Sequence, residues 1–523
     1  MICVLPREVK VNAMQAKLEH LQKIAVNQHL GDPTARQVDS HDALVMIAAD
    51  GVLKGRWPRL PYADVLKARL ERRKGAAPNQ PALAVDLPNA AGTRVVLAAL
   101  QGEPAAFDLL TLGRRLAAQA LEGQPRNVGV QVTGLTPDMA GRAAEAVVAA
   151  LLAAVAPMPS FKRKPQAPAP LRRIALYGAG RRLDLKRTRA EAEGNHLSRW
   201  LTQLPPNTLT PAHYRRTVAG LARQEGWRME FWDTRILTRR KAGAFLAVAQ
   251  GSPDADAGIV HLSYRPRTAG GQPARSARRN RGTVSLVGKG ICFDTGGVNL
   301  KPARYMLGMH EDMAGSAVAL GTLLALSRLQ VPFAVECWLA LAQNHIGPKA
   351  YKPNDVITAS DGTRIEVVNT DAEGRMVLAD TLALAGKRKP ALLLDYATLT
   401  GSCVDALSTR YSGAFTNTDA LSEKVIAAGR ASGERVWPFP TDRDFDEDLE
   451  SRVADVKQCA VENEADHILA ARFLNRFVPA EVPWVHVDLA SGNHKGGLAH
   501  VPTDITGFGV RFTLALLSQQ GLL

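Results

Sequence analysis

The sequence is poor in cysteine and has no paired cysteine motif. It holds 5 cysteines in 523 residues, and none is spaced as CxxC. A small number of scattered cysteines argues against a disulfide framework and favours free thiols in a reducing compartment. We therefore expect a cytoplasmic protein.

Long apolar runs are also absent. The longest uninterrupted run covers residues 146–156 and is too short to cross a bilayer as a helix. The N-terminal segment MICVLPREVKVN turns charged at Arg7 and lacks the apolar stretch and cleavage site of a secretory signal. These features predict neither a membrane span nor secretion.

Acidic residues are outnumbered by basic ones. The 65 Lys and Arg residues against 50 Asp and Glu give a formal net charge of +15, which would attract anions, including nucleic acid. Residues 265–282 contain six arginines and no acid, and their Gly, Pro and Ser content predicts an exposed loop. No base-reading module accompanies this charge, so a nucleic-acid partner is supported by charge alone.

Length and hydrophobic patterning predict two α/β domains. A chain this long exceeds what one core usually serves, and the five prolines of residues 157–170 exclude a regular element there. We predict a smaller N-terminal α/β domain over 1–185, with this Pro-rich linker, and a larger C-terminal catalytic domain over 186–523. Apolar runs that read as buried strands alternate in the larger domain with helical patterns, which predicts a mostly parallel, helix-covered central sheet. The strands are expected within 284–294, 333–342, 391–399 and 484–490, and the helices near 315–329 and 376–387.

Two segments place charged residues beside these apolar runs. The first, GKGICFDTGGVNLKP at 288–302 followed by MHEDM at 309–313, contains Lys289, Asp294, Lys301 and Asp312. The second, NTDAEGR at 369–375, has Asp371, Glu373 and Arg375 at alternate positions, so an extended backbone would point all three the same way. Burying a lone charge is costly, whereas carboxylates can bind and bridge hard divalent metals. The segments therefore predict a metal site at the carboxyl ends of the strands.

Both segments resemble the signature sequences of the leucyl aminopeptidase (M17) family, in the same order and with the same spacing. The similarity extends to DYATLTG at 395–401 and to ITGFGVR at 505–511. The first 185 residues resemble the family's variable N-terminal domain only in length and α/β character. The resemblance implies a hydrolase that releases N-terminal residues from peptides through a water activated by two metals.

The resemblance also implies a role for each site residue. One divalent ion (Zn²⁺, Mn²⁺ or Mg²⁺) would be held by Lys289, Asp294, Asp312 and Glu373, and a second by Asp294, Asp371 and Glu373. Lys289 would bind as a neutral amine, whereas Lys301 would stay charged and stabilise the oxyanion. Arg375 would hold a bicarbonate ion that serves as general base. The substrate would contact Met309, Thr398, Leu399 and Gly401, and the family relationship implies a homohexamer.

Two other classes of function compete with this hypothesis. A protein that binds nucleic acid through its basic surface would explain the charge but not the two motifs. A dinuclear hydrolase acting on another bond, such as a phosphoester, would use a similar set of carboxylates. The match across residues 395–401 favours peptides over the phosphoester.

Overall fold

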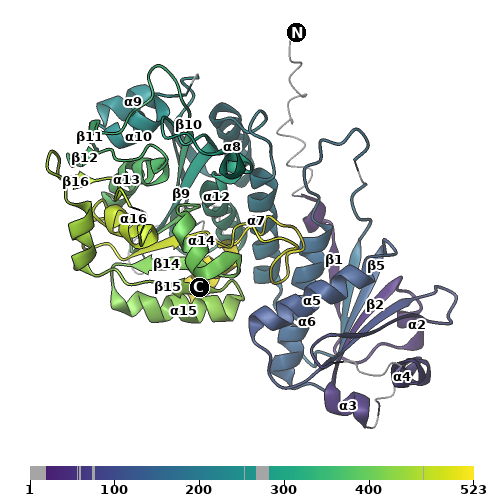
Figure 1. Ribbon diagram of the computed structural model, residues 1–523. Coiled ribbons are helices and arrows are strands. Elements are labelled where there is room, and N and C mark those ends of the chain that lie inside the picture. Colours follow the sequence, from purple (N-terminus) through teal and green to yellow (C-terminus); the bar gives the residue numbers. More distant parts are fainter. Residues whose placement is uncertain are drawn as a thin grey trace.

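The computed structural model describes residues 19–523 except 56, 58–59, 73–76, 166, 253, 267–281 and 463. The chain forms two α/β units that lie side by side, each built on its own sheet (Figure 1). A third, small sheet of β11 (Val356–Thr358), β12 (Arg364–Glu366) and β16 (Val456–Lys457) lies at the edge of the second unit. The basic loop predicted at 265–282 lies almost wholly outside the described residues.

The first unit has a six-stranded sheet in which five strands are parallel and β3 pairs antiparallel at one edge. One face packs against the long helices α5 and α6, and the other face is covered by shorter helices, among them α4. In sheet order the strands are β1 (Ala25–Gln28), β6 (Arg173–Tyr177), β5 (Asn127–Thr133), β2 (Ala43–Ala49), β4 (Arg94–Leu100) and β3 (Pro81–Asp86). The helices are α2 (Ala35–Val38), α3 (Asp50–Lys54), α4 (Ala63–Glu71), α5 (Ala106–Ala120) and α6 (Pro137–Val155).

The second unit has an eight-stranded mixed sheet whose centre is parallel. Strands β17, β13, β9 and β10 run parallel to one another, and β14, β8 and β7 bring antiparallel pairings toward the edges. In sheet order the strands are β15 (Val436–Pro438), β14 (Ser412–Thr416), β17 (Trp484–Asp488), β13 (Leu392–Ala397), β9 (Thr283–Asp294), β10 (Ala334–Asn344), β8 (Gly258–Tyr264) and β7 (Arg228–Asp233).

Helices cover both faces of this sheet, and strand side chains alternate between the two cores. In β10, Leu339 and Leu341 lie in one core, while Trp338 and Ala340 lie in the other. The first core is closed by α7 (Lys186–Thr202), α8 (Pro211–Glu225), α12 (Ala314–Arg328), α15 (Asp419–Ser432) and α17 (Val510–Gln519). The second is closed by α9 (Thr234–Arg239), α10 (Gly243–Ala249), α13 (Glu373–Gly386) and α16 (Asp466–Asn475).

This architecture confirms the predicted fold class, a mostly parallel and helix-covered central sheet with a smaller α/β unit before it. The four predicted strands are β9, β10, β13 and β17, and the two predicted helices are α12 and α13. The Pro-rich segment 157–170 joins α6 to β6, and its described residues, all but 166, form no helix or strand. Helix α7 packs against both α6 and α12, so it connects the two units (Figure 1). The predicted domain limit at 185 stays a prediction.

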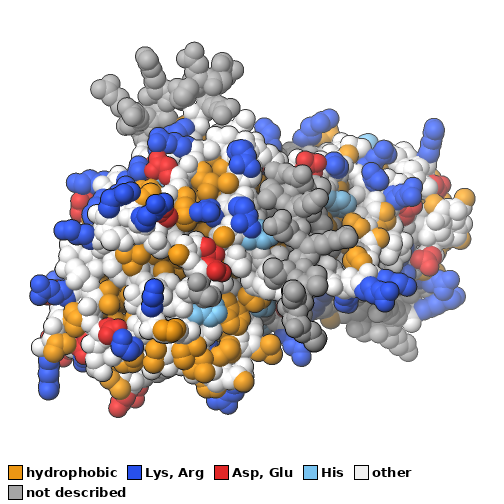
Figure 2. Space-filling view, turned by 90° about the horizontal axis from the view of Figure 1, so that it is seen from above, with side chains coloured by type: hydrophobic (Ala, Val, Ile, Leu, Met, Phe, Trp, Pro, Cys, Tyr) orange, Lys and Arg blue, Asp and Glu red, His pale blue; other side chains and the backbone are white. Residues whose placement is uncertain are grey.

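Positive charge is dispersed over the face of the protein that Figure 2 shows. Figure 2 shows Lys and Arg side chains scattered over the visible face of both units, with fewer acidic ones. The four cysteines within the described residues are buried and free, as expected. No helix in the described part of the chain combines the length and apolar character needed to cross a bilayer.

The first turn of α12 touches the backbone of β13 because residue 315 is glycine. A Cβ atom at Gly315 would lie 2.1 Å from the carbonyl oxygen of Tyr396, a backbone atom that cannot rotate away. We predict that Gly315→Ala destabilises the protein by about 1–3 kcal/mol or more, despite the better helix propensity of alanine. The measurement is the thermal unfolding midpoint. Gly123→Ala, where a Cβ meets nothing within 4 Å, is the matched control and should leave the midpoint unchanged.

Candidate active site

The two groups of predicted site residues lie together at the carboxyl edge of the central sheet. One group comes from β9 and the loop that follows it, and the other from the start of α13 and the residues just before it. Lys289 lies within β9 and Asp294 ends it, while Asp312 follows the short helix η2 (Met309–Glu311). The ammonium of Lys289 lies 2.8 Å from Asp312 Oδ1 and 2.8 Å from Glu373 Oε1. The fold therefore joins the two motifs into one cluster.

A second lysine bridges the remaining two carboxylates. Lys301 Nζ lies 2.9 Å from Asp294 Oδ2 and 2.5 Å from Asp371 Oδ1. One carboxylate oxygen from each of Asp294, Asp371 and Glu373 lies within 4.8 Å of the others, a spacing at which one cation can contact all three. Four carboxylates and two lysines are thus packed around one point.

The protein's own donors do not satisfy the cluster. Asp312 Oδ2 and Glu373 Oε2 are buried and accept no hydrogen bond from any described residue. Buried carboxylate oxygens without partners are costly, and four carboxylates face two ammonium groups. Oxygen donors and an excess of negative charge are what hard divalent cations require. The residues present therefore fit a metal centre.

The ionisation of the cluster reflects burial and close charges. Burial lowers the pKa of Lys289, but the carboxylates of Asp312 and Glu373 outweigh burial and hold that pKa above its usual value. The pKa of Lys301 is raised for the same reason, chiefly by Asp294. Burial and the Asp294 carboxylate raise the pKa of Asp371 to about 6, and burial raises that of Asp312 well above its usual range. The neutral amine predicted for Lys289 would therefore require the charge of a bound metal.

Several neutral side chains that the sequence did not single out hold the carboxylate cluster and its backbone in place. Asn344, at the carboxyl end of β10, donates to Asp294 Oδ1 at 2.8 Å and to the carbonyl of Thr370 at 3.0 Å. Tyr351 donates to the same carbonyl at 2.9 Å. Gln458 accepts from the backbone N–H groups of residues 368 and 369 and donates to the carbonyl of Ala372 at 2.9 Å. The position of Asn344 at a strand end was a usable signal; Gln458 had none.

Of the predicted substrate residues, Thr398 contacts the carboxylate cluster directly. Thr398 follows β13, donates its hydroxyl to Asp312 Oδ1 at 2.7 Å and offers its carbonyl to Lys289 at 3.0 Å. The N–H of Leu399 donates to Asp488 at 3.0 Å, and Gly401 begins α14 (Gly401–Leu407). Met309 begins η2, three residues before Asp312. Contact of these residues with substrate stays a prediction.

Arg375 lies differently from the expectation. The proposed extended backbone is wrong, because Glu373 and Arg375 lie in the first turn of α13. Arg375 is buried, and its Nη2 lies 2.7 and 2.8 Å from the two oxygens of Asp466, while Nη1 donates to the carbonyl of Gln458 at 3.1 Å. Burial lowers the pKa of Arg375, but Asp466 more than restores it. The sequence did not single out Asp466.

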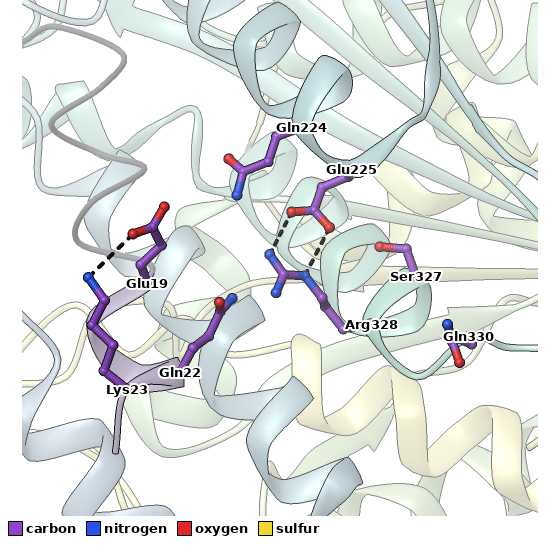
Figure 3. A pocket seen from close by; sticks show the side chains of 8 residues that line it. All are labelled: Glu19, Gln22, Lys23, Gln224, Glu225, Ser327, Arg328 and Gln330. Carbon is purple, nitrogen blue, oxygen red and sulfur yellow. Dashed lines mark hydrogen bonds and ion pairs between the residues drawn. The ribbon is translucent and has the colours of Figure 1, made fainter. Parts of the chain in front are cut away.

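A polar pocket elsewhere on the protein does not share these features. The pocket in Figure 3, of about 570 Å³, lies between the start of the described chain and the ends of α8 and α12. Its charged groups are paired with one another, Arg328 with Glu225 at 2.6 Å and Lys23 with Glu19 at 3.4 Å. No site residue predicted from the sequence lines it, so the carboxylate cluster is the candidate active site.

The fold and the cluster together define an α/β enzyme with a carboxylate-rich site that is compatible with divalent metals. Comparison with known proteins identifies the family. Residues 196–514 match the model for the catalytic domain of the cytosol aminopeptidase family, peptidase family M17. The chain belongs to this family, which confirms the resemblance and makes the protein a hydrolase of the aminopeptidase class.

Individual relatives agree with this assignment over most of the chain. The probable cytosol aminopeptidase of Parasynechococcus marenigrum is 39% identical over 412 residues, 76% of this chain and 80% of the relative. That of Bordetella pertussis is 36% identical over 482 residues, 88% and 93% of the two chains. Among solved structures, a tomato leucine aminopeptidase variant has a TM-score of 0.81 at 27% identity and covers 94% of this chain and 96% of its own. The bottromycin maturation enzyme BotP in complex with Mn has a TM-score of 0.75 at 31% identity, covering 92% and 100%.

Gly374 gives Lys289 the space to reach its two carboxylates. A Cβ atom at this position would lie 2.6 Å from both Cε and Nζ of Lys289, so the lysine would have to leave its place between Asp312 and Glu373. We predict that Gly374→Ala weakens divalent-metal binding by about 10-fold or more, as loss of a group that orients metal ligands typically does. Titration calorimetry with Mn²⁺ measures this effect. An affinity equal to that of the Gly123→Ala control would contradict the prediction.

Proposed function

We propose that this protein is a metal-dependent aminopeptidase that hydrolyses N-terminal residues from peptides with a water activated by two divalent metals. The observation that carries the proposal is the convergence of four buried carboxylates and two lysines at the carboxyl edge of the central sheet. Family membership supports the peptide as substrate. The charge and the unpartnered oxygens of the cluster support the metals.

The ligands fall into two overlapping sets. Lys289, Asp294, Asp312 and Glu373 would hold one ion, and Asp294, Asp371 and Glu373 the other, with Asp294 and Glu373 shared. When bound, two such ions lower the pKa of a water between them and polarise the substrate carbonyl. Oxygen donors suit Mn²⁺ and Mg²⁺, and a lysine amine suits Zn²⁺ as well. The Mn complex of the neighbour BotP supports divalent metals in general.

Lys301 would stabilise negative charge on the substrate. Its ammonium lies between Asp294 and Asp371, and its side chain is 14% exposed, so it reaches the surface of the cluster. Neighbouring carboxylates hold its pKa above the usual value, which keeps it charged at neutral pH. A fixed cation near the carbonyl oxygen of a bound peptide would favour the tetrahedral intermediate, in which that oxygen is negative, over the planar substrate.

Substrate orientation would come from the segment after β13. Thr398 contacts Asp312 through its hydroxyl, Leu399 is held by Asp488 through its N–H, and Gly401 has no side chain to restrict the approach of a peptide. Met309 lies three residues before Asp312, in η2, and would contact the side chain of the N-terminal residue. Peptide ends that carry an unblocked amino group are therefore the proposed substrates.

A homohexamer is the proposed assembly, by the family relationship. Exposed apolar side chains gather close to the site in the segment that joins β9 to η2, where Leu307 is 88% exposed and Leu300 is 53% exposed. A grouped apolar surface of this kind is typical of contact with another molecule. Light scattering after size exclusion would test the assembly.

The proposed activity predicts a metal-dependent turnover that one carboxylate controls. Protein stripped with a chelator should not hydrolyse aminoacyl p-nitroanilides, and Zn²⁺, Mn²⁺ or Mg²⁺ should restore the activity. Glu373→Ala, which removes a ligand shared by both ions, should lower kcat/KM by about 10³-fold or more with any metal. The variant Glu423→Ala, at an exposed position on α15, is the control. Full activity in the stripped protein would exclude the metal mechanism.

A further inference from the structure

Arg375 is already paired with a carboxylate of this chain. Its guanidinium is 2% exposed, and its Nη2 contacts both oxygens of Asp466. A buried cation requires an anion or a set of acceptors, and Asp466 and the carbonyl of Gln458 supply them. The charge of Arg375 is therefore balanced without any external ion.

This pair lies next to the candidate active site. Arg375 lies two residues after Glu373 in the first turn of α13, and Asp466 is the first residue of α16, which packs against α13. The carbonyl of Gln458 accepts from Nη1 of Arg375, and the side chain of Gln458 forms hydrogen bonds with the backbone of the loop that carries Asp371. The Asp466 side chain is 19% exposed, so the carboxylate is held by Arg375 on one side and retains some access to solvent on the other.

An external bicarbonate ion fits this arrangement poorly. The donors that would hold its oxygens include Nη2, which both oxygens of Asp466 already contact. Nε of Arg375 has no acceptor among the described residues, and Nη1 has one N–H left after its bond to Gln458. Each of the two parallel N–H pairs of a guanidinium includes Nη2, however, and Nη2 already contacts Asp466. A bound bicarbonate would also add a negative charge beside Asp466 and the four carboxylates of the cluster.

We propose that the carboxylate of Asp466 serves as the general base of this site, in place of an external bicarbonate ion on Arg375. The proposal rests on the proposed aminopeptidase function and changes one part of it. The enzyme then needs no added bicarbonate, because Asp466 provides the carboxylate that an external anion would otherwise bring. Arg375 is a positioning residue, which holds this carboxylate in place.

The chain contains a matched control for this pair. Arg472, on the same helix α16, contacts Asp446 through Nε at 2.9 Å and Nη2 at 2.6 Å. It is likewise mostly buried and also donates to a backbone carbonyl, that of Thr441. Asp446→Ala therefore breaks an equivalent arginine–carboxylate pair that contains none of the predicted site residues.

The first experiment measures kcat and KM of the full-length, metal-loaded protein in carbonate-free buffer, with and without sodium bicarbonate or formate. Wild-type kcat should not respond to either anion. Asp466→Ala should lower kcat by about 10²-fold with a smaller effect on KM, and formate or bicarbonate should restore part of the loss saturably. Asp446→Ala should show neither the loss nor the rescue. A structural role alone would not produce rescue by a small anion.

A second measurement does not depend on activity. Calorimetric titration with bicarbonate should give saturable binding to Asp466→Ala and none to wild type at the same concentrations. If Asp466→Ala does not fold, as judged by circular dichroism, Asp466→Asn replaces it, and the wild-type arm decides on its own. Bicarbonate binding or stimulation in wild type, or full kcat in Asp466→Ala, would overturn the proposal. Wild type that is inactive with every metal would instead overturn the proposed function, while the titration still identifies the anion on Arg375.

Discussion

Charge balance among buried groups at the carboxyl edge of the central sheet is the constraint on which the site depends. Four carboxylates lie around one point, and two lysines each reach two of them. Neither set is stable there alone, because like charges in a poorly solvated place repel and a lone buried ion is costly. The lysines reduce the repulsion but leave carboxylate oxygens without donors. A site that its own residues satisfy only in part is suited to bind cations.

The scaffold around the charges is neutral and restrictive. Three uncharged side chains, those of Asn344, Tyr351 and Gln458, hold Asp294 and the nearby backbone in place with hydrogen bonds. Two glycines leave room for close contacts: Gly315 lets α12 lie against the backbone of β13, and Gly374 lets α13 lie against Lys289. Orientation is thus supplied by groups that do not alter the charge balance of the cluster.

Much of this structure could be predicted from the sequence because its signals are local. The central strands are continuous apolar runs, and the charged residues that interrupt or end them stand out, as Lys289 and Asp294 do within β9. The pairing of Arg375 with Asp466 could not be predicted, since 91 residues separate them and nothing around Asp466 differs from an ordinary helix start. The upward shift of the Lys289 pKa could not be predicted either, because it depends on how closely Asp312 and Glu373 approach the ammonium. Long-range pairs are set by packing, which single-sequence patterns do not encode.

A carboxylate that belongs to the chain differs physically from one that must bind from solution. An external anion pays translational entropy each time it binds, and its occupancy follows its concentration, whereas a carboxylate on α16 is present at a high effective concentration at all times. The tethered group is restricted to the geometry that the packing of α13 and α16 allows. Arg375 gains a permanent partner at 2.7 Å, and the site becomes independent of dissolved carbonate. The same guanidinium also donates to the carbonyl of Gln458, whose side chain binds the loop that carries Asp371. The position of the Asp466 carboxylate is therefore linked to that loop. In this arrangement Arg375, where α13 packs against α16, holds both the Asp466 carboxylate and the segment of Gln458 that binds the loop before α13.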